Sequence, residues 1–175
     1  MFTDYSTHYR DNKELDSGVL VSDLSDHLIP NLLQLLASPM RARKAAILRQ
    51  LPWILSVMEP DMVLSSVYPP VLECLKDSDS SLCIMALDAC TMLTAYWIER
   101  KDEAGLNILN QKILIEMRSL ALDADVTVRQ KVVSVLAILI IMYDKINGML
   151  GIRVIISALG HTCTDCKSAL NERIR

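Results

Sequence analysis

The sequence predicts an all-α protein built from repeated helical hairpins, and three observations favour this fold class. The first is composition: apolar residues make up 51% of the chain and aromatic residues only 5%, with 5 Gly and 6 Pro. A chain rich in Leu, Ile, Val, Met and Ala, with few turn formers, favours helices over a β-sandwich. The other two observations are apolar residues at helical spacing and the recurrence of one hairpin pattern.

The clearest hairpin covers residues 28–58, where two amphipathic segments follow each other. Each has apolar residues three or four positions apart, as on one face of a helix. These residues are Leu28, Leu32, Leu35 and Leu36 in the first segment and Ile47, Leu51, Ile54 and Met58 in the second. Between them, Ser38 suits a helix N-cap and Pro39 the first helical position. We therefore expect a short turn and two antiparallel helices.

The same pattern recurs about 40 residues later and again 46 residues beyond that. Pro30, Leu32, Leu35, Ser38 and Ala46 have counterparts in Pro70, Leu72, Leu75, Ser78 and Ala86. The stretch that begins at Leu120 then follows the pattern of the stretch that begins at Cys74. Self-similarity at this period, in hairpins too small to bury their own faces, is typical of an α-solenoid.

The hairpins resemble HEAT repeats, which carry a proline in the first helix, an aspartate at the turn and a hydrophobic-arginine pair in the second helix. Pro30 and Pro70 match the proline, and Asp77 and Asp123 match the aspartate. The hydrophobic-arginine pair is matched by Ala42-Arg43 and Val128-Arg129 and in part by Leu82-Cys83. The sequence departs from the pattern at Ala37, Cys83 and Glu116.

This resemblance implies a right-handed α-solenoid of about four helical hairpins. It also implies an architectural ladder of charges between neighbouring repeats, formed by Asp77, Asp123 and Arg129 with Arg43.

We expect two regions: a polar arm over residues 1–24 and a HEAT-repeat domain over residues 25–175, its last repeat truncated. The Gly18–Val21 run of the arm either docks on the first repeat as a cap or belongs to the tail of a region that precedes it. The chain ends within its last predicted helix, so we expect a fragment of a longer protein.

Single residues predict the shape of several helices. Pro52 should kink the second helix, Pro69-Pro70 should bend or split the third, and Asp79 or Ser80 should cap the fourth. A charged linker is expected over residues 99–105. The predicted helices cover residues 25–37, 40–58, 60–75, 80–98, 107–122, 127–143 and 149–159, with an eighth from residue 164.

Composition excludes several classes of function. The net charge is −3 and alternates in sign: residues 1–27 carry six acids and two bases, and residues 28–60 one acid and four bases. This pattern argues against a continuous basic track for nucleic acid. The most apolar run, Val132–Met142, is too short for a transmembrane segment, which needs about 20 residues. An odd number of cysteines, five, and a polar N-terminus favour reduced thiols in the cytoplasm.

The sequence offers little catalytic chemistry. Its three histidines lack the spacing of a metallopeptidase, and no nucleophile elbow or P-loop occurs. We therefore expect no enzyme activity and no cofactor. His161, Cys163 and Cys166 are the one cluster that could bind zinc, but they supply three ligands where a structural site uses four. Two ordinary thiols at the start of a helix are the alternative interpretation.

Four cations gather in the second helix: Arg41, Arg43, Lys44 and Arg49. They form either a solvated helix face or a docking patch for an acidic peptide, an anionic lipid or a tubulin tail. Trp53 and Trp97 lie beside apolar faces, so we expect both in the core, although tryptophan is common in binding hot spots.

These observations predict a non-catalytic scaffold that binds other proteins in the cytoplasm. Three stretches, residues 38–51, 58–82 and 106–129, give residues 29–138 a resemblance to the helical region of Scy-like pseudokinases. This resemblance implies vesicle traffic and peripheral association with membrane coats. A tubulin-binding array of tumour-overexpressed-gene domains is an alternative, although it needs basic turns and those at Asp77 and Asp123 are acidic. A regulatory scaffold for a serine/threonine phosphatase is a further alternative.

Overall fold

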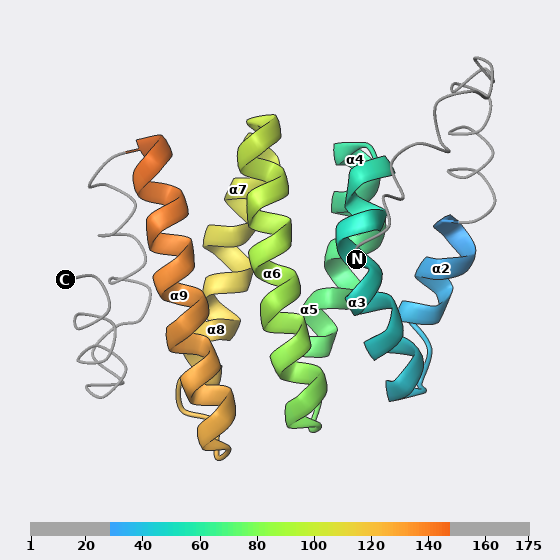
Figure 1. The fold of residues 1–175 in the computed structure, drawn as a ribbon, viewed down its shortest axis with the longest axis vertical. Helices are drawn as coiled ribbons and strands as arrows, with labels where there is room; N and C mark the ends of the chain where they lie inside the picture. The colour runs from blue at the N-terminus through green and yellow to red at the C-terminus, as the bar shows by residue number, and fades with distance from the viewer. Residues whose placement is uncertain (1–28, 148–175) are drawn as a thin grey trace, which may run out of the picture.

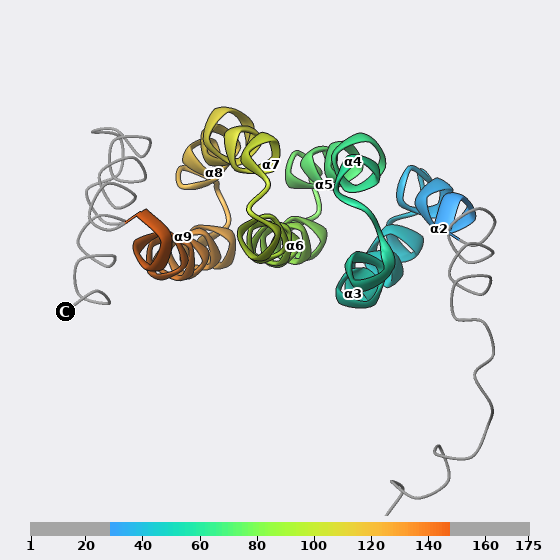
Figure 2. The same cartoon turned by 90° about the horizontal axis from the view of Figure 1, so that it is seen from above.

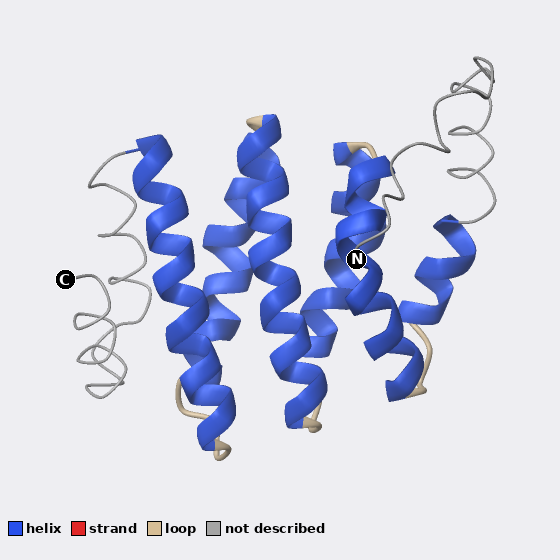
Figure 3. Ribbon diagram, viewed as in Figure 1, coloured by secondary structure: helices blue, strands red, loops and turns tan. Residues whose placement is uncertain are grey.

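The computed structural model describes residues 29–147, and all regular structure in this part of the chain is helical (Figure 3). The first pair of helices is α2 (Ile29–Leu36) and α3 (Arg41–Val57). The second pair is a long helix, made of α4 (Pro60–Met62), a π-helical segment (Val63–Val67) and α5 (Tyr68–Leu75), followed by α6 (Ser80–Arg100). The third is made of α7 (Glu103–Ile108), a π-helical segment (Leu109–Ile113) and α8 (Leu114–Leu120), followed by α9 (Val126–Asn147). The all-α prediction is confirmed for these residues.

The helices form two layers. Seen from above, α3, α6 and α9 lie side by side in one layer, and α2, α5 and α8 lie in the other (Figure 2). Within each pair the two helices run in opposite directions (Figure 1). Helix α6 packs against α3 on one side, α9 on the other, and α5 in the opposite layer. Each pair therefore contacts mainly the pair before it and the pair after it.

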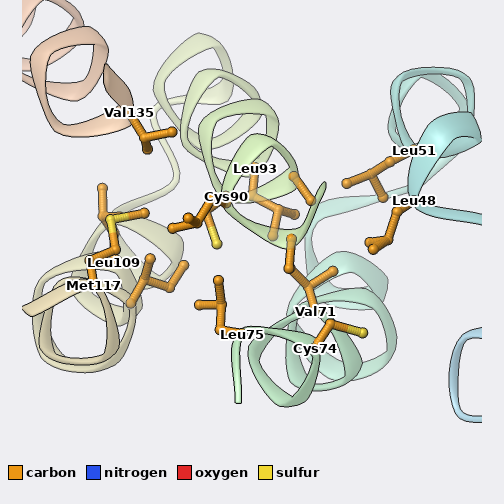
Figure 4. Close-up of a cluster of buried hydrophobic side chains, with 14 of the residues drawn as sticks. Leu48, Leu51, Val71, Cys74, Leu75, Cys90, Leu93, Leu109, Met117 and Val135 are labelled. Carbon is orange, nitrogen blue, oxygen red and sulfur yellow. The ribbon is translucent and has the colours of Figure 1, made fainter. Parts of the chain in front are cut away.

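One apolar core runs between the two layers (Figure 4). The predicted face of the second helix is confirmed, because Ile47, Leu51, Ile54 and Met58 are all buried. Complete burial of a side chain of this size contributes about 1.5–3 kcal/mol to stability. Leu93 and Cys90 of α6 join the same core (Figure 4). The core is therefore continuous from the first pair to the third.

Helix α6 is long and apolar enough to cross a membrane by length and composition alone. However, 56% of its most apolar window is buried inside the fold. This burial is what a central core helix requires, because its neighbours cover it on both sides. The length and composition of α6 are thus accounted for by its place between α3 and α9.

The first turn differs from its prediction. Met40, not Ser38, precedes the first residue of α3, and Pro39 lies before the helix instead of at its first position. The Ser38 hydroxyl instead accepts a hydrogen bond from the Met40 backbone N–H at 3.2 Å, which closes a small turn outside the helix. A side-chain cap is therefore missing at the start of α3.

The expected charged linker at residues 99–105 is also wrong. Helix α6 continues to Arg100, and α7 already begins at Glu103. Lys101 adopts a left-handed conformation (φ 54°, ψ 37°) that ends α6, and the Asp102 carboxylate caps α7 by accepting the Gly105 N–H at 3.1 Å. The spacing of 46 residues, where the earlier one is 40, comes instead mostly from longer helices. Helix α6 has 21 residues and α3 has 17.

Gly105 is required by the close approach of α7 to α6. A Cβ atom at this position would lie 2.3 Å from the ring of Trp97, which is fully buried. The expectation that Trp97 belongs to the core is confirmed.

The prolines of the third predicted helix do not split it. Pro69 and Pro70 occupy the first turn of α5, where a missing N–H costs little, and the π-helical segment lies just before them. The third pair has its own π-helical segment 46 residues later, and no proline follows it. The irregular turn therefore does not depend on proline. Helix α3 likewise continues through Pro52.

Several predictions lie outside the described residues. These are the N-terminal arm, the start of the first helix, the seventh and eighth helices, and the candidate zinc ligands His161, Cys163 and Cys166.

Candidate functional site

Two of the four predicted surface cations, Arg41 and Lys44, form ion pairs within the fold. Arg41 Nε lies 3.1 Å from Asp77 Oδ1, and its Nη1 lies 3.7 Å from Asp79 Oδ2. Arg41 Nη2 also donates a hydrogen bond of 2.8 Å to the Ser78 hydroxyl. Lys44 Nζ lies 4.0 Å from Asp77 Oδ2. Arg41 and Lys44 therefore link the first pair of helices to the turn of the second pair.

The turn that receives these cations is itself ordered by aspartates. Asp77 Oδ1 accepts the backbone N–H of Asp79 at 3.0 Å. Asp79 Oδ1 in turn accepts the N–H groups of Ser81 and Leu82, which caps α6. The predicted cap at Asp79 is confirmed, and such a cap contributes about 1 kcal/mol.

The turn between α8 and α9 repeats this arrangement. Asp123 Oδ1 accepts the N–H of Asp125 at 2.8 Å, and Asp125 Oδ1 accepts the N–H and hydroxyl of Thr127. Hydrogen bonds from the Ser80 hydroxyl first, and then from Thr127, lower the pKa of Asp125 from 3.8 to about 2. Ser80 thereby connects the second pair of helices to the turn of the third.

The predicted charge ladder between neighbouring helical pairs does not form with the expected partners. Arg129 Nη1 donates to the backbone oxygens of Asp123 and Ala124, at 2.7 and 3.0 Å, so it braces its own turn. Asp77 is paired with Arg41 and Lys44, and Arg43 forms no ion pair with any residue in the described range. Position matching to a repeat pattern missed these partners, because Arg41 and Asp77 are far apart in sequence.

The other two cations, Arg43 and Arg49, are exposed on α3. No acidic residue occurs anywhere from Ile29 to Val57, so the first pair has no carboxylate of its own to neutralise them. Trp53 is exposed as well, with 42% of its surface accessible. The prediction that Trp53 lies in the core is wrong, although its neighbours Leu51 and Ile54 are buried.

These three side chains share one face of α3. At about 100° per residue, Arg43, Arg49 and Trp53 lie within an arc about 120° wide. The buried residues Ile47, Leu51 and Ile54 lie in the adjacent arc, whose centre is about 110° away. We call Arg43, Arg49 and Trp53, with the small and polar residues Ala42, Ala46 and Gln50 between them, the α3 outer face.

The exposed apolar surface continues onto the neighbouring helices. Counted from the first residue of each helix, Trp53 of α3 corresponds to Met92 of α6 and to Ile138 of α9. Met92 is half-buried and Ile138 exposed. Since α3, α6 and α9 lie side by side in one layer (Figure 2), these three residues hold corresponding positions in neighbouring helices. On the neighbouring helices, Asp88 of α6 is paired with Lys131 of α9 at 2.5 Å.

A hollow of about 430 Å³ opens on the surface between α2, α3 and α5. Its walls are mostly apolar, and Lys44 and Glu73 supply its charges. The remaining lining residues are Leu36, Ala37, Tyr68, Pro69, Pro70 and Leu72. Lys44 already approaches Asp77, so the hollow holds no charge arranged for a particular ligand.

The described cysteines, Cys74, Cys83 and Cys90, are free and buried. Burial raises the pKa of Cys83 to about 11, with a further contribution from Asp123, and burial also raises the pKa of Cys90 and Cys74. Thiols of this kind are protonated and unreactive at neutral pH. Over residues 29–147, no three His, Cys, Asp or Glu side chains are grouped so that they could hold a metal ion.

Comparison with models of known protein families gave no match, and comparison with curated proteins gave no significant match. The assignment of a site therefore depends on the geometry of the described residues, among which the α3 outer face combines two unpaired arginines and an exposed tryptophan in a helical pair that has no acidic residue of its own.

Proposed function

We propose that this protein is a non-catalytic scaffold that binds another protein through the α3 outer face. The observation that carries the proposal is an exposed tryptophan on the same helix face as two arginines that have no ion-pair partner in the described range. Trp and Arg are the residues most enriched among interface hot spots, because they bring large contact areas together with directional polar contacts.

The scaffold is proposed to be a right-handed HEAT-like solenoid. Two features of the described residues support a repeat. The π-helical segments Val63–Val67 and Leu109–Ile113 are 46 residues apart, as are the turns at Asp77 and Asp123. Both turns contain the same aspartate hydrogen bond to the backbone two residues later. In such an array each pair would contact only its neighbours, which leaves one side of each layer available for binding.

The chemistry of the surface favours an acidic protein segment with an apolar side chain as partner. Arg43 and Arg49 would bind carboxylates, and Trp53, Met92 and Ile138 would receive the apolar group. A nucleic acid is a poorer match, because phosphate backbones are bound by many cations.

Such a scaffold would act in the cytoplasm, and the resemblance to Scy-like pseudokinases supports a place in vesicle traffic with coat components as partners. Tubulin is the alternative partner that the surface chemistry also permits, because its tails are acidic. A phosphatase scaffold has no particular support from the surface.

The experiment that tests the proposal is a selection of displayed peptides of defined sequence on the immobilised full chain. We expect enrichment of acidic peptides that contain an aromatic or large aliphatic residue. Enrichment should be lost with Arg43→Glu/Arg49→Glu and with Trp53→Ala. Equal enrichment by these variants and by the wild type would contradict the proposal.

The matched control is Lys112→Glu/Arg118→Glu, which makes the same change in charge at exposed residues of the other layer. This control should leave the enrichment unchanged. Arg41 and Lys44 are unsuitable for the test, because replacing them would break contacts with Asp77 and Asp79 inside the fold. Peptides that match coat components or tubulin tails would then distinguish vesicle traffic from microtubule binding.

A further inference from the structure

The charges of the chain are unequal on the two sides of residue 28. Residues 1–27 carry six acids and two bases, a net charge of −4. The first helical pair, from Ile29 to Val57, carries four bases and no acid. Asp77 and Asp79 neutralise Arg41 and Lys44, which leaves Arg43 and Arg49 on the α3 outer face. An acidic segment thus lies next in sequence to a pair of helices that has an excess of positive charge.

The geometry of the first pair brings the two within reach. Helix α2 runs antiparallel to α3, so Ile29 lies at the end of the pair where α3 finishes (Figure 1). Trp53 is near that end, and Arg43 lies ten residues earlier, about 15 Å along the helix. An extended chain of ten residues spans about 33 Å. The part of the sequence just before residue 28 is therefore long enough to follow the whole α3 outer face.

The order of residues in that segment also suits the face. Val19, Leu20 and Val21 form an apolar run, with Glu14 and Asp16 before it and Asp23 after it. If the chain is followed backwards from residue 28, the apolar run comes before Asp16 and Glu14. Followed from its C-terminal end, the α3 outer face has the same order, with Trp53 first and then Arg49 and Arg43.

We propose that residues 14–23 of this chain bind along the α3 outer face, with Val19–Val21 against Trp53 and the carboxylates of Glu14 and Asp16 towards Arg49 and Arg43. The segment is an internal occupant of the surface. It uses the same face as the proposed function, and an external acidic partner would have to displace it. Its test requires no external partner, so the two proposals can fail separately.

The test is zero-length carbodiimide cross-linking of the full chain carrying Arg49→Lys, which places a reactive amine on the face. We expect an intramolecular cross-link from position 49 to Glu14, Asp16 or Asp23, mapped by mass spectrometry in the monomer band. Arg118→Lys on α8 is the matched control, and it should give no cross-link to these residues. Cross-links at position 49 that occur only in dimers would overturn the proposal in favour of a second copy, and the absence of any cross-link at position 49 would also overturn it.

A second measurement leaves α3 unchanged. Trp97 is fully buried, so acrylamide quenching of tryptophan fluorescence reports mainly on Trp53. The variant Glu14→Gln/Asp16→Asn/Asp23→Asn should raise the quenching constant to the value that the wild type reaches at high salt. The control Asp61→Asn/Glu99→Gln/Glu103→Gln removes the same charge from exposed acids elsewhere and should behave as the wild type. A quenching constant that is the same in all three proteins and independent of salt would overturn the proposal.

Discussion

The interface between the first and second helical pairs and the interface between the second and third have the same turn but different polar links. Asp77 and Asp123 each accept the backbone N–H two residues later, and Asp79 and Asp125 each cap the next helix. At the first interface, Arg41 and Lys44 reach forward from α3 to the turn. At the second, the first turn of α6 carries no cation, and the Ser80 hydroxyl is the largest cause of the lowered pKa of Asp125.

The second interface obtains its ion pairs elsewhere, from Lys131 of α9 to Asp88 of α6 and from Lys76, at the end of α5, to Glu116 of α8. The first also has a buried hydrogen bond, from the Tyr96 hydroxyl to the Met58 carbonyl at 2.7 Å. The comparison shows that each turn is held by hydrogen bonds from its own aspartates. Its backbone does not depend on which side chain of the neighbouring pair contacts it. The crossing contacts can therefore differ between interfaces while the backbone stays the same.

The largest effect should come from the apolar core that both interfaces share. Leu51→Asp places an unpaired charge at a position with no exposed surface and should lower the unfolding free energy by about 4 kcal/mol or more. Thermal unfolding followed by circular dichroism measures this loss. Gln50→Asp, at the exposed neighbouring position, is the control and should change stability little. Similar melting temperatures for the two variants would mean that the first pair does not belong to the common core.

A smaller loss of stability should distinguish the turn at Asp77 from the turn at Asp123. Asp77→Ala removes a backbone hydrogen bond together with contacts to Arg41 and Lys44, and should cost about 1–2 kcal/mol. Asp123→Ala removes the equivalent backbone hydrogen bond and should cost about 1 kcal/mol. Urea unfolding at low and high salt measures the difference, which should shrink with salt because ion pairs are screened. A difference that does not change with salt would show that Arg41 and Lys44 contribute nothing to the first interface.

The smallest effect concerns the pKa of Asp125 at the second interface. Ser80→Ala should raise the pKa of Asp125 from about 2 towards 3.8, because the Ser80 hydroxyl is the largest cause of its lowering. A lowered pKa stabilises the fold above pH 3.8, and this contribution is lost as the pH falls through about 2. Carboxyl carbon chemical shifts followed by NMR between pH 5 and pH 1.5 measure the pKa. Ser81→Ala is the control, and an equal Asp125 pKa in both variants would remove Ser80 from the interface.

The sequence predicted the elements of the fold better than their connections. Apolar spacing located the buried face around Leu51, and the start of α6 followed from Asp79, because both depend on residues close in the chain. The exposure of Trp53 could not be read from spacing, since this residue lies directly between the buried positions Leu51 and Ile54.

The candidate site was predicted only in part. Four cations on one helix suggested a patch, but the sequence could not show that Arg41 and Lys44 are paired with a turn more than 30 residues away. It likewise treated residues 99–105 as a linker, because charge suggested a loop where Asp102 in fact begins a helix. Partners that meet only through folding leave no periodic signal in one sequence.

The π-helical turns bear on which sequences the fold accepts. Pro69 and Pro70 are the second and third residues of the segment that follows one such turn, and Ile115 and Glu116 hold the same positions after the other. The change from π-helical to α-helical hydrogen bonding at this point accepts a residue that most helix interiors reject, since the first positions of an α-helical segment tolerate proline. The layer that contains α5 and α8 therefore has a position in each helix where proline can be gained or lost without a change of architecture.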